Sequence, residues 1–292
     1  MDTTLKREKK KIEFYLERLS GQRFSGSLSG ACGYTVNAGG KRLRPILMVA
    51  MYRALGGRRK SVYPISLSIE LIHSYSLIHD DLPQLDNDDY RRGKYTCHKV
   101  FGTQTALLAG VDLIGSSVGN IVSAGRRARL GGDTIRQLTA ELMRASGVHG
   151  LVGGQVADII YESREFDERS LQYIHKHKTA VLFAAATSMA AILAGIKKQK
   201  MGHVREYGMQ LGFAFQVIDD ILDTIGTFED LGKKVGKDAS QGKATFPALF
   251  GVDGARERAK AHISNAVDLL DLAGLNDRFL RLLPLWIQGS AC

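Results

Sequence analysis

Residues 212–223 read GFAFQVIDDILD and predict a buried α-helix. Four polar residues in this stretch follow the spacing i, i+3, i+4, i+7, which places them in one stripe along a helix. They are Gln216, Asp219, Asp220 and Asp223. The flanking residues are apolar, and carboxylates buried without counter-charge cost on the order of several kcal/mol each. A solvated acidic face is the alternative, which the apolar surroundings disfavour, so the stripe predicts bound cations.

Helical patterns continue from this stretch toward both ends of the chain. Alanine and leucine recur at helical spacing, alternating strand patterns are nearly absent, and the hydrophobic content is 44%. The five prolines are scattered, and no linker-like tract marks a domain boundary. We therefore expect an all-α fold in a single domain over residues 1–292. An amphipathic helix is expected near the N-terminus, because Ile12, Leu16 and Leu19 share one helix face.

The cysteines and the N-terminal segment predict a cytoplasmic protein. Cys32, Cys97 and Cys292 are too few and too irregularly spaced for a disulfide framework or a zinc site, so free thiols are expected. The N-terminal segment has no apolar core, so it is not expected to be a secretory signal. The uncharged stretch from Thr179 to Ile196 reaches the length of a membrane span. Its Thr and Ser residues favour a buried core helix, and no stable membrane attachment is expected.

A second acid-rich stretch lies at residues 80–93, DDLPQLDNDDYRRG. The preceding residues are helical in pattern, and Pro83 cannot continue a helix, so Asp80 and Asp81 are expected at a helix C-terminus. Asp86 follows Asp80 by six residues, a spacing that needs a bend to bring the two together. A helix C-terminus carries partial negative charge, which disfavours three acids unless cations bind there. Oxygen clusters of this kind suit Mg²⁺ together with phosphate oxygens.

Basic motifs supply partners for an anionic group such as a diphosphate. Residues 39–45, GGKRLRP, place cations after two glycines, which let the backbone approach a ligand closely. The motif HKHKTA places Lys178 and Thr179 at a helix N-terminus, which suits phosphate binding. The two histidines of that motif, His175 and His177, are interpreted as local surface residues.

Two features leave alternatives open. The formal net charge of +10 is compatible with nucleic-acid binding, but the basic residues are dispersed and not interleaved with aromatics, so no nucleic-acid partner is expected. A positive field also steers anionic substrates toward a site. In GGQVAD, Gln155 and Asp158 lie three apart on one helix face, where they either support a site or make ordinary core hydrogen bonds.

The motifs together resemble those of the trans-isoprenyl diphosphate synthase family, and most of all the bacterial short-chain farnesyl or geranylgeranyl diphosphate synthases. They occur in the order and approximate spacing of that family, over Ala38 to Gly251 in detail. The motifs are GGKRLRP, SLIHDDLPQLDNDDYRRGKYTCHKVFG, GGQVAD, HKTA, GFAFQVIDDILD and GKATFPAL. Any one of them alone would be a weak signal, but six in register are specific.

The resemblance implies the isoprenoid synthase fold, a helical bundle around a deep central cavity, and a homodimer. It implies three Mg²⁺ ions per site, held by Asp80, Asp86 and Asp219, with support from Asp81, Asp220 and Asp223. The implied contacts to the allylic diphosphate are Arg91, Lys178, Thr179, Gln216, Lys233 and Lys243. The implied contacts to isopentenyl diphosphate are Lys41, Arg44, His73 and Arg92. Catalysis itself is implied for Asp80, Asp81, Asp86, Arg91, Lys178, Asp219, Asp220 and Lys233.

The chemistry implied by the resemblance is prenyl transfer. The metals and cations stabilise diphosphate as a leaving group, the allylic carbon becomes a carbocation, and the double bond of isopentenyl diphosphate attacks it. The length of the product is set in this family just before residues 80–93, which are the first acid motif along the chain. There Tyr75 is bulky and Ser76 is small. We expect Tyr75 to act as a floor that favours farnesyl diphosphate, although Ser76 lies more directly beneath Asp80 on a helical wheel.

Three rival interpretations remain. A geranylgeranyl diphosphate synthase would run the same chemistry with a deeper pocket. A class I terpene cyclase would carry a different second metal motif, and a non-catalytic subunit would be expected to have lost acids or basic contacts. Two departures from the family pattern bear on pocket shape: Tyr95 stands where proline is usual, and Asp112 is displaced by one position.

Overall fold

The computed structural model describes residues 1–23, 26, 28–162, 164–225 and 243–289. The expected all-α class is confirmed, and the strands described form one short antiparallel hairpin. The elements of the first half are α1 (Asp2–Arg23), α2 (Ser29–Val36), α3 (Leu43–Ala54), α4 (Val62–Asp80), β1 (Tyr90–Arg91), β2 (Lys94–Tyr95), α5 (Cys97–Phe101) and α6 (Thr103–Arg127). Those of the second half are α7 (Gly132–Ser146), α8 (Leu151–Tyr161), α9 (Glu168–His175), the π-helical turn η1 (Lys176–Ala180), α10 (Val181–Ala194), α11 (Lys198–Ile225), α14 (Phe246–Leu272) and α15 (Arg278–Gly289).

The described residues fall into two compact units. The first comprises Met1, Ala50–Arg58 and the described part of Ala140–Cys292, and the second comprises Asp2–Val49 and Arg59–Thr139. The acid motif at residues 80–93 therefore lies in the second unit. The GFAFQVIDDILD stripe, residues 212–223, lies in the first unit. One domain over the whole chain remains a prediction.

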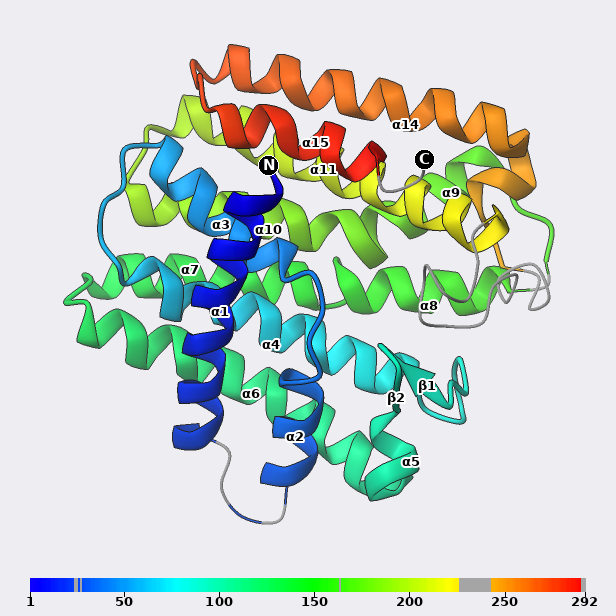
Figure 1. The fold of residues 1–292 in the computed structure, drawn as a ribbon, viewed down its shortest axis with the longest axis horizontal. Helices are drawn as coiled ribbons and strands as arrows, with labels where there is room; N and C mark the ends of the chain where they lie inside the picture. The colour runs from blue at the N-terminus through cyan, green and yellow to red at the C-terminus, as the bar shows by residue number, and fades with distance from the viewer. Residues whose placement is uncertain (24–25, 27, 163, 226–242, 290–292) are drawn as a thin grey trace. The chain divides into compact units, whose positions relative to one another are not determined.

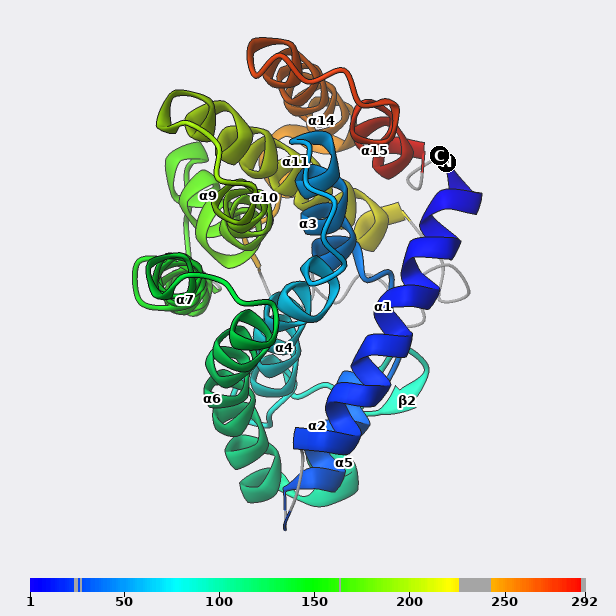
Figure 2. The same cartoon turned by 90° about the vertical axis from the view of Figure 1, so that its left-hand side faces the viewer.

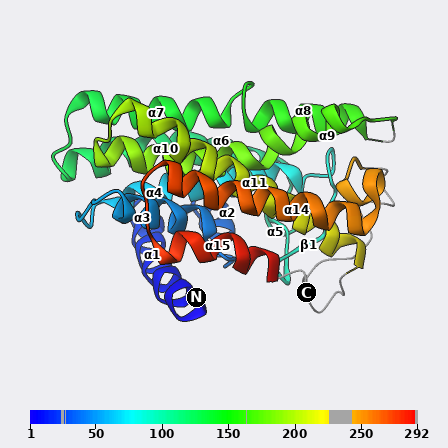
Figure 3. The ribbon, with the colours of Figure 1, turned by 90° about the horizontal axis from the view of Figure 1, so that it is seen from above.

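In the first unit, α11 packs along α10 on one side and α14 on the other, and α15 lies against both α11 and α14 (Figures 1 and 3). Gly212 of α11 allows a close approach to η1, because a Cβ there would come within 2.5 Å of Ala180 Cα. The backbone of α11 therefore lies directly against η1. This contact sets the Asp-rich half of α11 beside the HKHKTA motif.

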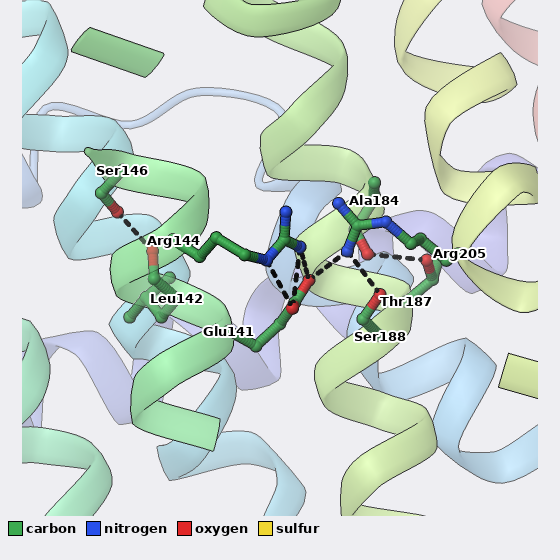
Figure 4. A network of polar contacts seen from close by, with 8 residues as sticks. All are labelled: Glu141, Leu142, Arg144, Ser146, Ala184, Thr187, Ser188 and Arg205. Atoms are coloured by element: carbon green, nitrogen blue, oxygen red, sulfur yellow. Dashed lines mark hydrogen bonds and ion pairs between the residues drawn. The ribbon is translucent and has the colours of Figure 1, made fainter. Parts of the chain in front are cut away.

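A polar network also ties α7 to α10 and α11 within the first unit (Figure 4). Glu141 accepts hydrogen bonds from Arg205 at 2.5 Å and from Arg144 at 2.7 Å. Arg205 lies 3.4 Å from the hydroxyl of Ser188. Because the carboxylate is shared by two arginines and is mostly buried, the network holds α7, α10 and α11 together.

In the second unit, α4 and α6 run side by side, and α1 and α2 pack against α4 (Figure 2). Asn120 of α6 donates to Pro64 O at 2.7 Å and to Ser68 Oγ at 2.9 Å, so this helix pair is held partly by buried polar contacts. The predicted amphipathic N-terminal helix is confirmed as α1, whose Ile12 and Leu16 are buried.

Two helical stretches are apolar and long enough to cross a membrane by composition alone, 103–127 and 168–194. In the second of these, α10 is buried without interruption from Val181 to Ala191. The prediction that Thr179–Ile196 is a core helix is therefore confirmed. Only 39% of the most apolar part of the first stretch is buried, so α6 leaves part of its apolar face exposed.

Candidate active site

The first acid motif follows the C-terminal end of α4, as the sequence predicts. Asp80 is the last helical residue and Asp81 is the C-cap. The chain then turns back on itself, and the main-chain N–H of Asp86 donates to Asp80 O at 2.9 Å. This bend brings the backbone of Asp86 next to Asp80 although the spacing of six does not align on a helix. Both residues are partly exposed, which suits groups that bind a ligand.

Asp81 is buried and is held by Arg91. The guanidinium donates through Nε at 2.7 Å and lies 2.5 Å from the same carboxylate oxygen through Nη2. Burial raises the pKa of Asp81 to about 6, against the opposing effect of the Arg91 charge. In this arrangement Asp81 orients Arg91, which agrees with the supporting role expected for this carboxylate.

Arg91 and Arg92 are presented by the β1–β2 hairpin. Its two-residue turn has positive φ at Arg92 (56°) and at Gly93 (73°), as a type I′ turn requires. Tyr90 and Tyr95 face each other across the strands with ring centroids 4.6 Å apart. Tyr95, which stands where the family pattern usually has proline, therefore supplies a cross-strand stack that stabilises the hairpin.

Arg92 reaches from this turn to the GGKRLRP loop, where its guanidinium donates to Gly39 O. Gly40 has a φ of 112°, and a Cβ at that position would come within 2.5 Å of the guanidinium carbon. The glycine pair thus makes room for Arg92, which is a different use from the close ligand approach expected from the sequence.

The GGKRLRP loop is anchored by a buried ion pair. Arg42 Nη1 lies 2.6 Å from Glu70 Oε1, and both side chains are 2% exposed. Arg42 also donates to Val36 O at 2.7 Å. This anchor leaves Lys41 exposed and Arg44 partly exposed on either side of Arg42.

His73 of α4 lies in the electropositive environment formed by these basic residues. Burial lowers its pKa well below the ordinary value, and the positive charges nearby lower it further. The contributing guanidiniums are those of Arg44, Arg92, Arg91 and Arg42. These guanidinium groups and the imidazole come from the segments that are expected from the sequence to contact isopentenyl diphosphate.

Tyr75 and Ser76 are both buried in α4, one turn before the acid motif. The Tyr75 ring packs edge-on against His79, with centroids 5.7 Å apart. Burial raises the pKa of the Tyr75 hydroxyl to about 12, and the negative charge of Asp80 adds to the rise. Ser76 Oγ donates to His73 O at 3.0 Å, which turns the small side chain back onto its own helix.

The α11 stripe is linked to η1 by a chain of hydrogen bonds. Thr179 Oγ1 donates to Gln216 Oε1 at 2.6 Å, and Gln216 Nε2 donates to Asp220 Oδ1 at 2.9 Å. The other carboxylate oxygen of Asp220 accepts from the main-chain N–H of Phe246 at 3.1 Å. Asp220 and Asp223 are buried, whereas Asp219 is partly exposed. Of the three acids of the stripe, Asp219 is therefore the one that solvent reaches.

His175 contradicts the expectation of a surface residue, because it is only 4% exposed. Its Nε2 lies 3.5 Å from Asp220 Oδ2, and its ring packs 5.1 Å from that of Phe246. Its Nδ1 is buried without a hydrogen-bond partner among the described residues. His177 is partly exposed and packs on Tyr173, so the expectation is correct only for this second histidine.

Lys178 is oriented by Asp158 of α8, whose carboxylate lies 2.5 Å from Nζ. Of the two alternatives for the GGQVAD motif, this ion pair favours support of the site over a core hydrogen bond for Asp158. Lys243 is partly exposed just before α14. Lys233 lies outside the described residues.

The donor set fits Mg²⁺. Within the described residues, no group of three His, Cys, Asp or Glu side chains is arranged as a complete metal cage. Mg²⁺ does not need one, because it usually takes one or two carboxylates and completes its shell with water and substrate phosphate. In each unit the partly exposed carboxylates suit this role: Asp80 and Asp86 in one, and Asp219 in the other.

Two buried pairs of the site, Arg42–Glu70 and His175–Asp220, were not predicted from the sequence. Glu70 had a detectable signal, since it is a lone carboxylate within the apolar run SLSIELI. A lone buried acid normally requires a cationic partner. For His175 the sequence offers no comparable signal, because its partner is 45 residues away.

The chain is similar to proteins of known activity over most of its length. The sequence model of the family described as polyprenyl synthetase matches residues 26–271. Farnesyl diphosphate synthase from Bacillus subtilis (strain 168) is 41% identical over 266 residues, covering 89% of this chain and 86% of that protein. Geranylgeranyl diphosphate synthase from Cyanophora paradoxa is 41% identical over 234 residues, covering 80% and 77%. The crystal structure of geranyltransferase from Helicobacter pylori, complexed with magnesium and isoprenyl diphosphate, has a TM-score of 0.85 at 30% identity, covering 99% and 96%.

Proposed function

Because this chain belongs to the polyprenyl synthetase family, we propose that it condenses isopentenyl diphosphate with allylic diphosphates to make farnesyl diphosphate. It is a short-chain prenyltransferase, and its fold is the all-α isoprenoid synthase fold. The observation that carries the proposal is that carboxylates hold the site cations in place: Asp81 of the 80–93 acid motif holds Arg91, and Asp158 of GGQVAD holds Lys178. A non-catalytic subunit would have no need of both acid motifs in this form.

Two anion subsites are proposed. Isopentenyl diphosphate binds near His73, where Lys41, Arg44 and Arg92 supply positive charge; the depressed pKa of His73 supports this, because it reflects the cationic surroundings. The allylic diphosphate binds at Lys178, Thr179, Gln216, Arg91, Lys233 and Lys243. Steering by the net charge of +10 favours entry of both anions.

The metal requirement is proposed as three Mg²⁺ ions per site, with Asp80, Asp86 and Asp219 as protein ligands. The crystal structure of a relative, geranyltransferase from Helicobacter pylori, is a complex with magnesium and isoprenyl diphosphate, and it supports the same cofactor here. Asp81 and Asp220 are engaged by Arg91 and by Gln216, so we assign them to support rather than ligation.

The reaction follows from charge and position. When bound, Mg²⁺ neutralises diphosphate oxygens and makes the group a better leaving group. Lys178 and Thr179 hold the allylic diphosphate in place, so that the C–O bond ionises to a delocalised carbocation with little covalent work by the protein. The double bond of isopentenyl diphosphate attacks this cation, and the proton then lost passes to the released diphosphate. Apolar walls around the growing prenyl group exclude water, which would otherwise capture the cation.

Product analysis tests the function and the role of Tyr75 together. The purified protein, with Mg²⁺ and isopentenyl diphosphate, is given dimethylallyl, geranyl or farnesyl diphosphate in separate reactions. We expect a fifteen-carbon product from the two shorter primers and no elongation of farnesyl diphosphate. We expect Tyr75→Ala to extend the product, because a buried ring would be replaced by a methyl group.

Ser76→Ala is the matched control, because it removes only a hydroxyl that donates to the main chain of its own helix. Unchanged products in Tyr75→Ala would reject the floor. A twenty-carbon product from the wild type would favour the geranylgeranyl synthase alternative, which the Cyanophora paradoxa relative also suggests. Absence of elongation with every primer would reject the enzyme and favour a non-catalytic subunit.

The active form is proposed to be a homodimer working in the cytoplasm. On α6, Leu107, Leu108 and Val111 are each about half exposed, and α8 exposes a similar apolar row. Patches of this kind on soluble proteins usually mark an interaction surface, and a second copy of the chain is the proposed partner. We expect the wild type to sediment as a dimer and Leu108→Glu to sediment as a monomer. A monomeric wild type at micromolar concentration would contradict the proposal.

A further inference from the structure

Three segments of the first unit meet at the buried carboxylate of Asp220. The first is the end of α9 with His175, the second is α11 with Asp220 itself, and the third is the start of α14 with Phe246. Asp220 Oδ2 lies 3.1 Å from the main-chain nitrogen of Phe246 and 3.5 Å from His175 Nε2. The imidazole also packs on the Phe246 ring. One carboxylate oxygen and one imidazole therefore connect all three segments.

The protonation state of His175 follows from its contacts. Burial lowers its pKa to about 3, so the ring is neutral near pH 7. A neutral imidazole carries one N–H. Since Nε2 faces a carboxylate and Nδ1 has no hydrogen-bond partner among the described residues, the hydrogen belongs on Nε2. His175 is thus neutral, with its Nε2–H directed at Asp220 across 3.5 Å, a separation longer than a normal hydrogen bond.

Each of the three segments carries a residue assigned to the allylic subsite. Lys178 and Thr179 follow His175 by three and four residues, Gln216 precedes Asp220 by four, and Lys243 precedes Phe246 by three. A small rotation of the Asp220 carboxylate would alter the start of α14 and the position of Gln216 together, because the Phe246 N–H and Gln216 both donate to it. The effect would reach Thr179 through Gln216, which accepts from the Thr179 hydroxyl.

We propose that His175 is a positioning residue: its contact with Asp220 and its packing on Phe246 hold the start of α14 in register with α11 and η1, and so align the allylic diphosphate subsite. It does not touch the substrate. The expected effect on KM rests on the proposed prenyl transfer, whereas the expected effect on the backbone at Phe246 does not.

Hydrogen exchange in the absence of substrate and Mg²⁺ tests the structural consequence. His175→Phe keeps an aromatic ring beside Phe246 but has no N–H. We expect the amide of Phe246, resolved by NMR or by fragmentation, to exchange about tenfold faster in this variant, because its acceptor loses orientation. His177→Phe, two residues away in the same motif, is the matched control and should exchange like the wild type. His175→Gln, which keeps a donor, should restore part of the protection.

Steady-state kinetics test the functional consequence. We expect His175→Phe to raise KM for the allylic diphosphate about tenfold and to leave KM for isopentenyl diphosphate within about twofold, because the latter subsite is built from residues of the other unit. A general structural defect would instead change KM for both substrates, or would lower only the amount of active protein.

Unchanged exchange at Phe246 in a folded His175→Phe protein would overturn the proposal. Equal acceleration in α15 of the same unit would also overturn it, since that would mean general destabilisation. If the wild type shows no prenyl transfer but Phe246 still responds to His175→Phe, the proposed function fails and the positioning role stands.

Discussion

Replacing Asp219 by asparagine is expected to lower the rate of prenyl transfer by about 10²–10³-fold, the effect of losing one preorganised group that stabilises developing charge. Asp219 is the partly exposed acid of the α11 stripe, whereas its neighbour Asp220 is buried against protein donors. Asparagine preserves the size and polarity of the side chain but removes the negative charge that Mg²⁺ requires. We expect the concentration of Mg²⁺ needed for half-maximal rate to rise as well.

The measurement is a rate assay with a Mg²⁺ titration for the wild type and three variants. Asp268→Asn is the matched control, because it removes an exposed acid from α14 and should leave the rate unchanged. Asp220→Asn should differ from Asp219→Asn by lowering thermal stability too, since Asp220 accepts from Gln216 and from the Phe246 main chain. A rate within about threefold of wild type for Asp219→Asn at low Mg²⁺ would refute the assignment.

Replacing Glu70 by alanine is expected to lower the free energy of unfolding by about 3–5 kcal/mol, the usual cost of leaving one member of a buried ion pair without its partner. Arg42 and Glu70 are both 2% exposed, so water cannot compensate the guanidinium left behind. The loop that bears Lys41 and Arg44 should also loosen, because Arg42 ties it to α4. The loss is measured as the shift of the denaturant midpoint at constant slope.

Glu257→Ala provides the comparison. Its pair with Lys260 has nearly the same separation, 2.7 Å, but both side chains are exposed, so the loss should stay below about 1 kcal/mol. The double replacement Arg42→Met with Glu70→Leu should recover most of the loss, since apolar residues of similar volume often replace a buried pair without cost. Equal losses of unfolding free energy in Glu70→Ala and Glu257→Ala would show that burial does not determine how much the ion pair contributes to stability.

Local patterns in the sequence account for much of the site. The helix end at Asp80 was predictable because proline three residues later cannot continue a helix. The bend that returns Asp86 was predictable because a spacing of six does not fit the helical repeat. The α11 stripe was predictable from spacing alone, since side chains three and four apart lie on one face. Each of these inferences involves residues within about one or two helical turns.

Contacts between distant segments escaped prediction. The sequence suggested that the glycines of GGKRLRP admit a ligand, but Gly40 makes room for Arg92, which lies 52 residues further along. It suggested that His175 is a surface residue, but α11 and α14 bury it. In both cases the environment of the residue is set by elements that no local pattern specifies.

By itself, the sequence determined an all-α chain, the acid and basic motifs, and through them the family and its chemistry. Helical periodicity and residue type act over a few positions, so they can be read without coordinates. Only the tertiary structure decided which acids are exposed and which are bound by protein. Asp219 and Asp220 are adjacent and chemically identical, yet α11 directs one toward solvent and packs the other against His175 and Phe246. That difference arises from burial and from partners brought in by folding, which is why the division of roles within each acid motif required the fold.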